Sequence, residues 1–216
     1  MFNLKPEKFK KPLIIFSLVI FILSSSFAYF TAIPLTGHDG DLSESVSHVP
    51  NSEEFISAVG NGISGEIRGV YVPGVFALRV QQQPGNDANY VSSVVGAATQ
   101  FEHAAQYGVT GFLAHNYLSG SLFFDLEVDH EVLVVYGDGS TKRYMVREVQ
   151  QYQALQPNSP YSDFVDLDTN QKLSSGDLFN RVYAGEDHVT FQTCIAEDGN
   201  LTWGRLFVIA TPVEEL

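Results

Sequence analysis

The sequence is poor in cysteine and in basic residues. Its 216 residues include one cysteine, and 12 Lys plus Arg stand against 25 Asp plus Glu, a formal net charge of −13. A single cysteine excludes a disulfide within the chain and a zinc site built on two or more thiolates. The acidic balance disfavours nucleic-acid binding, because such a chain repels phosphate backbones.

The few basic residues are gathered at the N-terminus. Residues 1–12 hold four lysines and one glutamate, which leaves 12 − 4 = 8 basic and 25 − 1 = 24 acidic residues in the rest. The next segment, 13–33, is uncharged and largely apolar. A bilayer core takes about 20 such residues as a helix, and lysines before them predict that this end stays in the cytoplasm.

A cleaved signal peptide is the alternative, with Ser-Phe-Ala at 26–28 as a small-x-small cleavage site. We favour the uncleaved anchor, because the apolar run continues past Ala28. Both interpretations place the rest of the chain outside the cytoplasm. If the anchor is retained, the protein is a single-pass protein of the cell membrane. The predicted organisation is a cytoplasmic basic tail (1–12), a transmembrane signal-anchor (13–33), an extracytoplasmic linker (34–64) and a folded domain (65–216).

The folded domain has the pattern of a β protein. Short β-rich runs alternate with turn residues, including Gly-Asp-Gly at 137–139, a tight hairpin signal. A helix is expected at 173–183, a helix or irregular crossover at 94–107, and a loop at 155–160. The predicted strands are 67–72, 75–80, 109–115, 131–136, 142–150, 189–195 and 206–210, and the stretch 122–126 is short and aromatic. Many short strands of this kind predict a closed barrel or a sandwich.

The single cysteine lies near the end of the predicted strand 189–195. Because side chains alternate along a strand, Cys194 shares a face with Thr190 and Gln192 rather than with Val189 and Phe191. This polar face argues against a core thiol. A lone cysteine in an exported protein indicates either intermolecular pairing or a reactive thiol; the alternative is a small buried hydrophobe.

Arg205 stands just before the next strand, and a loop at 196–204 would return the chain beside Cys194. A nearby cation favours the thiolate, and arginine offers a planar fork of donors to an oxyanion. A surface arginine at a strand terminus is the alternative. His115 ends the strand 109–115, where an imidazole can exchange protons near neutral pH. A structural role is the alternative for His115, since periodicity does not separate it from the five other histidines.

These residues also resemble a known family. Residues 190–194 (Thr-Phe-Gln-Thr-Cys), followed by 205–208 (Arg-Leu-Phe-Val), are similar to the sortase signature of a Thr-Leu-x-Thr-Cys strand and a later Arg. Residues 111–116 (Gly-Phe-Leu-Ala-His-Asn) resemble the sortase strand that ends in Gly-His. The similarity covers roughly 65–212. Two positions depart from the pattern: Ala114 where glycine usually precedes the histidine, and Phe191 where leucine usually stands.

The resemblance implies a sortase-like closed β-barrel of about eight strands with one or two short helices. It implies an extracytoplasmic transpeptidase that cleaves a sorting motif of the Leu-Pro-x-Thr-Gly type and transfers the acyl group to an amine. Its partners would be exported proteins bearing the motif and an amine acceptor, with no nucleic acid. Cys194 would be the nucleophile, His115 the acid and base, and Arg205 the substrate and oxyanion support. Thr193 would help to bind substrate or the oxyanion.

No cofactor or metal is implied by this chemistry. Some sortases use calcium, and Asp125, Glu127 and Asp129 alternate along the chain, but a solvated acidic face is the preferred interpretation, since hard cations need six or more oxygens. Two other functions stay open. A thiol peptidase would use the same residues for hydrolysis alone, and a tethered β-barrel binding module would carry Cys194 incidentally.

Overall fold

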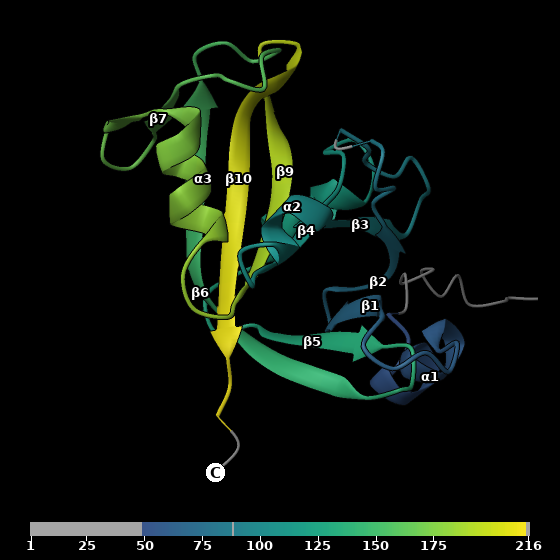
Figure 1. Cartoon of the computed structure of the whole chain (residues 1–216). Helices are drawn as coiled ribbons and strands as arrows, with labels where there is room; N and C mark the ends of the chain where they lie inside the picture. Colours follow the sequence, from purple (N-terminus) through teal and green to yellow (C-terminus); the bar gives the residue numbers. More distant parts are fainter. Residues whose placement is uncertain (1–48, 88, 215–216) are drawn as a thin grey trace, which may run out of the picture. The chain divides into compact units, whose positions relative to one another are not determined.

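Eight strands close into a barrel (Figure 1). The computed structural model describes residues 49–87 and 89–214, all within one compact unit, Ser45–Leu216. The strands follow one another around the barrel in the order β10-β9-β4-β3-β2-β1-β5-β6, and β6 pairs with β10 to complete the circle. The barrel strands are β1 (Ile67–Val72), β2 (Phe76–Gln82), β3 (Ala97–Phe101), β4 (Thr110–Leu113), β5 (Glu131–Tyr136), β6 (Thr141–Ala154), β9 (Val189–Glu197) and β10 (Asn200–Pro212). The prediction of a closed, mostly β barrel is therefore confirmed.

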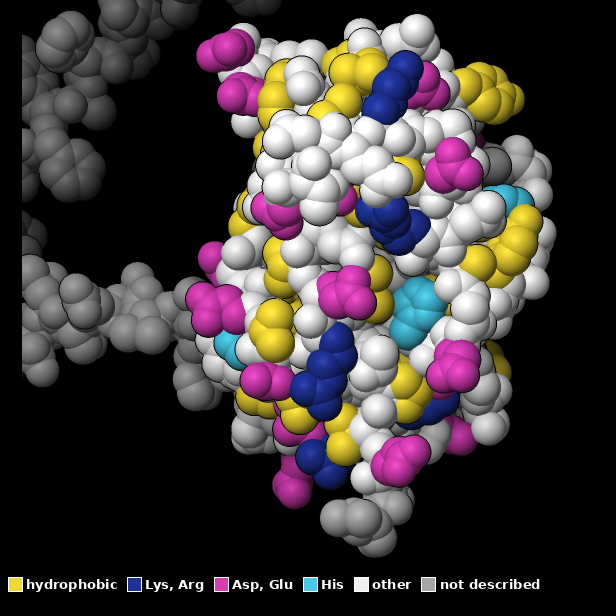
Figure 2. All heavy atoms as spheres, turned by 90° about the vertical axis from the view of Figure 1, so that its left-hand side faces the viewer, with side chains coloured by type: hydrophobic (Ala, Val, Ile, Leu, Met, Phe, Trp, Pro, Cys, Tyr) yellow, Lys and Arg dark blue, Asp and Glu magenta, His cyan; other side chains and the backbone are white. Residues whose placement is uncertain are grey.

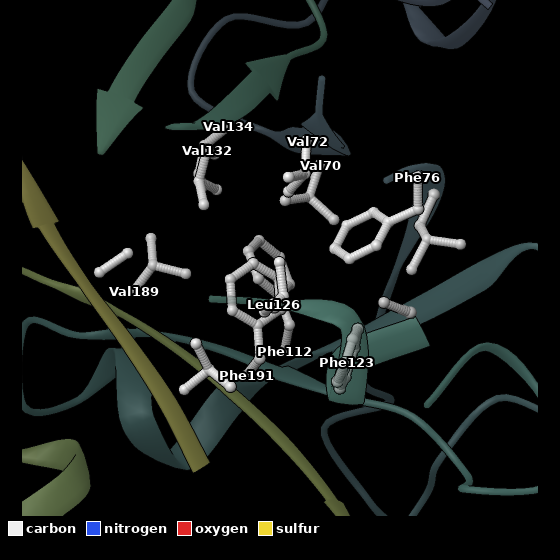
Figure 3. Close-up of a cluster of buried hydrophobic side chains, with 14 of the residues drawn as sticks. Val70, Val72, Phe76, Phe112, Phe123, Leu126, Val132, Val134, Val189 and Phe191 are labelled. Carbon is white, nitrogen blue, oxygen red and sulfur yellow. The ribbon is translucent and has the colours of Figure 1, made fainter. Parts of the chain in front are cut away.

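The barrel interior is packed with aliphatic and aromatic side chains (Figure 3). Phe191 of β9 is fully buried, and its ring centroid lies 6.0 Å from that of Phe76, 5.5 Å from that of Phe112 and 5.1 Å from that of Phe123. Offset and edge-on aromatic pairs of this kind add to the free energy gained from burial. The phenylalanine at 191 therefore fills the centre of the barrel.

A second core lies outside the barrel, beneath helix α3 (Ser175–Tyr183). Leu178, Val182 and Tyr183 of α3 pack with Phe207 and other outward-facing residues of β10 and β6. The helix begins at a capping box, in which the Ser174 side chain and Asp177 satisfy each other's backbone N–H groups. Two short strands, β7 (Phe164–Asp166) and β8 (Lys172–Leu173), extend the sheet from β6 toward this helix.

Helix α1 (Ser52–Val59) packs against strands β1 and β5. Phe55 and Val59 are buried beside Tyr71 and Val135. Gly69 leaves room for this contact, because a Cβ there would lie 2.7 Å from the Phe55 ring. A short helical turn is predicted near 53–59 within the linker 34–64, and the structure has helix α1 there, packed against β1 and β5.

The predicted tail (1–12) and anchor (13–33) lie outside the described residues. Among residues 49–87 and 89–214, no helix combines the length and the apolar composition needed to cross a bilayer.

The structure contains elements beyond the predicted ones. The segment 94–107 contains β3 and the short helix α2 (Glu102–Ala105), and 122–126 belongs to a 3-10 helix, η1 (Ser119–Asp125). The strands β7 and β8 were not expected. Each of these has only two or three residues, too few to give a period-2 pattern.

The surface on the side of α3 and β6 carries charges of both signs (Figure 2). Acidic and basic side chains are interspersed there rather than gathered by sign. Ion pairs on the described chain include Lys142 with Asp187 and Arg181 with Asp166. This face therefore offers no field of a single sign to steer a strongly charged partner.

Candidate active site

Cys194 and Arg205 face each other across two adjacent strands. They are direct partners in the antiparallel pairing of β9 with β10. Side chains of directly opposed residues emerge on the same face of a sheet, with Cβ atoms about 4.5–5.5 Å apart. The register therefore places the side chains of Cys194 and Arg205 next to each other on one face of the sheet, as the predicted return of the chain required.

His115 reaches the same place from the other side of β9. Strand β4 runs parallel to β9 with Leu113 opposite Gln192, and the Ala114 N–H donates to the Gln192 carbonyl at 3.2 Å. His115 therefore lies two residues beyond Leu113, the last paired residue of β4. Leu113 faces outward, and Ala114 belongs to the barrel core, so alternation returns His115 to the outer face shared with Cys194.

These three side chains line one cavity of about 470 Å³. Its other walls come from β6–β7 loop residues, from α3 and from the outer faces of β3 and β10. The part of the wall that belongs to α3 and its neighbours is apolar: Phe101, Phe164, Leu178, Phe179, Val182 and Phe207. The cavity thus joins a polar end, where chemistry can occur, to a wall suited to apolar side chains.

Cys194 is a free, half-buried cysteine. It is reachable from the cavity, and it is not packed among core residues as an inert thiol would be. The prediction that Cys194 lies on the polar face of its strand agrees with this position.

Arg205 is held in place by main-chain carbonyls. Its Nη1 donates to the carbonyls of Thr202 and Gly204 at 2.9 and 2.8 Å, and its Nη2 lies 3.4 Å from that of Pro157. A guanidinium has five N–H donors, so three bonds of this kind fix its plane and leave donors for a ligand. The contact to Pro157 also ties the loop after β6 to the site, a link that no sequence pattern indicated.

Thr193 also lines this cavity, and its part in binding substrate or the oxyanion stays a prediction. It is 2% exposed, and its hydroxyl donates to the Ala114 carbonyl at 2.9 Å. This hydrogen bond joins β9 to the segment that carries His115. The side chain points to the face opposite Cys194, because neighbouring residues of a strand alternate.

Gly120 belongs to the same arrangement and was missed in the sequence. A Cβ at this position would lie 2.6 Å from the Ala114 carbonyl oxygen and 2.7 Å from that of His115, and it would also meet the Thr193 hydroxyl. The Gly120 N–H in turn donates to the His115 carbonyl at 2.9 Å. The signal available in the sequence was a glycine five residues after the histidine, which alone says nothing of close packing.

Behind the cysteine, Tyr183 fixes the neighbouring Gln192. The Tyr183 hydroxyl donates to Gln192 Oε1 at 2.6 Å. Burial raises the pKa of Tyr183 far above its ordinary value. The phenol therefore stays neutral and remains a donor, which keeps α3 attached to the strand of the cysteine.

Among the described residues, no group of three or more His, Cys, Asp or Glu side chains could hold a metal ion. Of the three acids considered for calcium, Asp129 forms an ion pair with Arg147 at 2.8 Å.

No family model matches the sequence, and no curated protein matches it. The chain is similar in fold to solved sortase structures. Sortase A of Listeria monocytogenes is 12% identical with a TM-score of 0.44, and the match covers 68% of this chain and 88% of that one. Sortase A from Corynebacterium diphtheriae is 15% identical with a TM-score of 0.47, covering 70% of this chain and 62% of that one. Sortase C1 from Streptococcus suis is 14% identical with a TM-score of 0.47, covering 76% and 79%. At these identities the likeness extends to the fold alone.

Proposed function

We propose that this protein is a sortase-like cysteine transpeptidase that acts outside the cytoplasm, held there by the predicted segment 13–33. One observation carries the proposal. The register of three neighbouring strands brings Cys194, Arg205 and His115 to one face and one cavity. A nucleophile, a proton-transfer group and a fixed cation are the parts that acyl transfer from a peptide requires.

The first half-reaction forms a thioester. The Cys194 thiolate attacks the carbonyl carbon of the scissile peptide bond, and Arg205 donates to the oxyanion that develops. The tetrahedral intermediate collapses with cleavage of the C–N bond, and the His115 imidazolium protonates the departing amine. The N-terminal part of the substrate stays on the sulfur, and the C-terminal part leaves.

The second half-reaction reverses these roles. An incoming primary amine attacks the thioester carbonyl while neutral His115 accepts its proton. Collapse of the second intermediate forms a new peptide bond and releases the Cys194 thiolate. The same residues serve both steps, and no electron is transferred, so no oxidant or reductant is needed.

The cavity suggests the class of substrate. Its apolar wall, with Phe164, Leu178 and Val182, suits an aliphatic side chain a few residues before the scissile bond. A motif of the Leu-Pro-x-Thr-Gly type has such a residue, and its exported bearers and an amine acceptor would be the partners of the protein.

Mass spectrometry tests the proposal directly. The full chain is incubated with a library of Pro-x-Thr-Gly-type peptides, with and without a glycine-based amine. We expect an acyl adduct on Cys194, a product that depends on the amine, and loss of both in Cys194→Ala. Product that consists only of hydrolysed peptide, with added amine present, would favour a thiol peptidase. A folded protein without an adduct, whose thiol also ignores alkylating reagents, would refute the enzyme and favour a binding module.

A further inference from the structure

The imidazole of His115 makes no hydrogen bond to any residue in 49–87 or 89–214. Two other histidines differ: both ring nitrogens of His188 lie 2.7 and 3.1 Å from backbone carbonyl oxygens, and Nδ1 of His130 accepts a backbone N–H at 3.2 Å. Where an imidazole serves as a base, a third group usually orients it. Within the described chain no carboxylate performs that task for His115, so its ring needs another restraint.

The main chain around His115 is already fixed. The His115 carbonyl accepts the N–H groups of Leu118 and Gly120, both at 2.9 Å. The side chain of the next residue, Asn116, donates to the Leu201 carbonyl at 2.9 Å and so joins this segment to the β9–β10 hairpin. These bonds set the position of the Cα atom but leave the two side-chain torsions of the histidine free.

Tyr117 restrains the ring itself. The rings of His115 and Tyr117 are stacked, with centroids 5.0 Å apart and planes 14° from parallel. The ring contacts of His103 are less parallel, at 41° to 81°. Tyr117 is 61% exposed and has no other ring contact with the described residues. A large ring left in solvent gains little from burial, so its contact with His115 is its main interaction.

We propose that Tyr117 is a positioning residue, which holds the His115 imidazole over the cavity by stacking on its face. The stack restricts rotation of the imidazole, and the π-face attracts the ring more strongly while it carries the positive charge of the imidazolium. This inference rests on the proposed function, because positioning matters only where His115 transfers protons.

The size of the effect follows from the strength of such pairs. The free energy of an aromatic pair corresponds to about a 2- to 12-fold change in a rate or equilibrium constant. Because Tyr117 acts on the orientation of His115 rather than on substrate, the loss belongs to kcat and leaves KM unchanged.

Three substitutions separate stacking from bulk. Tyr117→Phe keeps the ring, Tyr117→Leu keeps an apolar side chain without a ring, and Tyr117→Ala removes both. In the full chain labelled at histidine, the ring protons of His115 should show the ring-current shift of a stacked aromatic, assigned with His115→Gln. We expect Tyr117→Phe to keep this shift and to rescue kcat, and the Leu and Ala variants to lose the shift and about 2- to 12-fold in kcat.

Several results would overturn the inference. A raised KM at constant kcat would mean that Tyr117 contacts substrate and does not position the histidine. A Leu variant as active as the Phe variant, or ring-proton shifts unchanged by Tyr117→Ala, would equally exclude stacking as the cause. If wild-type protein forms no adduct with any peptide, the proposed function and this role fail together. If the wild-type protein does form an adduct, the Tyr117 variants alone test the positioning role of Tyr117.

Discussion

Replacing Gly120 by alanine should damage the site from its buried side. The new Cβ would lie 2.6 and 2.7 Å from the carbonyl oxygens of Ala114 and His115, and it would also meet the Thr193 hydroxyl. Two of these three atoms belong to the backbone, which cannot turn aside as a flexible side chain can. Either η1 or the segment that carries His115 must therefore move.

The cost can be bounded from this geometry. Overpacking of a well-packed region costs about 1–3 kcal/mol, which for a chain of this size lowers Tm by about 2–12 °C. A displacement of a catalytic group by about 1 Å can cost about 100-fold in rate. Gly120→Ala should therefore lower both Tm and kcat, and the fall in kcat should exceed what partial unfolding at the assay temperature explains.

Gly176→Ala is the matched control. Gly176 lies in α3, where a Cβ meets nothing closer than the Ser174 hydroxyl at 3.9 Å, and alanine favours a helix by up to about 1 kcal/mol over glycine. Thermal unfolding followed by circular dichroism, and initial rates of transpeptidation, are measured for both variants. If Gly120→Ala has the Tm and the kcat of Gly176→Ala, the close packing around His115 is not what positions it.

Substitutions at three further positions test other parts of the domain. Arg205→Lys should lower kcat by about 100-fold or more, because a point charge cannot keep three carbonyl contacts and still donate to an oxyanion; near-normal turnover would remove Arg205 from the mechanism. Thr193→Val should lower the free energy of unfolding by about 1–3 kcal/mol, since the Ala114 carbonyl loses a buried donor, and Thr193→Ser should restore it; urea titration measures both. Burial works to raise the pKa of Asp166, but hydrogen bonds from the following turn and the Arg181 charge hold it below its ordinary value. Its stabilising effect is thus complete above about pH 4 and is lost as the pH falls through the lowered pKa. Asp166→Asn should accordingly be less stable than wild type at pH 6, and the difference should shrink at pH 2; a constant difference would contradict this.

Period-2 patterns and turn residues were sufficient to predict most of the barrel. The strands expected at 67–72 and 131–136 have those bounds in the structure, and helix α3 lies within the predicted range 173–183. These elements are long or carry a clear local signal. Strand β3 was missed because it begins with two alanines, which have low β propensity, and what holds it is burial and pairing on both sides, with β2 and β4.

The candidate site was predicted only in part, for a related reason. The nearness of Arg205 to Cys194 could be expected, because a short loop joins their strands. The position of His115 could not be derived from local pattern, since the parallel pairing of β4 with β9 joins residues far apart in the chain. The roles of Gly120 and Tyr117 depend on the path of the chain after β4, which no sequence signal described.

The packing of the barrel and the chemistry of the site are set by one register. Phe191 is held in the barrel by three aromatic neighbours, and Cys194, three residues on, must then face outward. A slip of β9 by one residue would take Phe191 out of the barrel and turn the thiol into the core. The phenylalanine at 191, where the sortase pattern usually has leucine, therefore helps to hold the register in which Cys194 lies opposite Arg205.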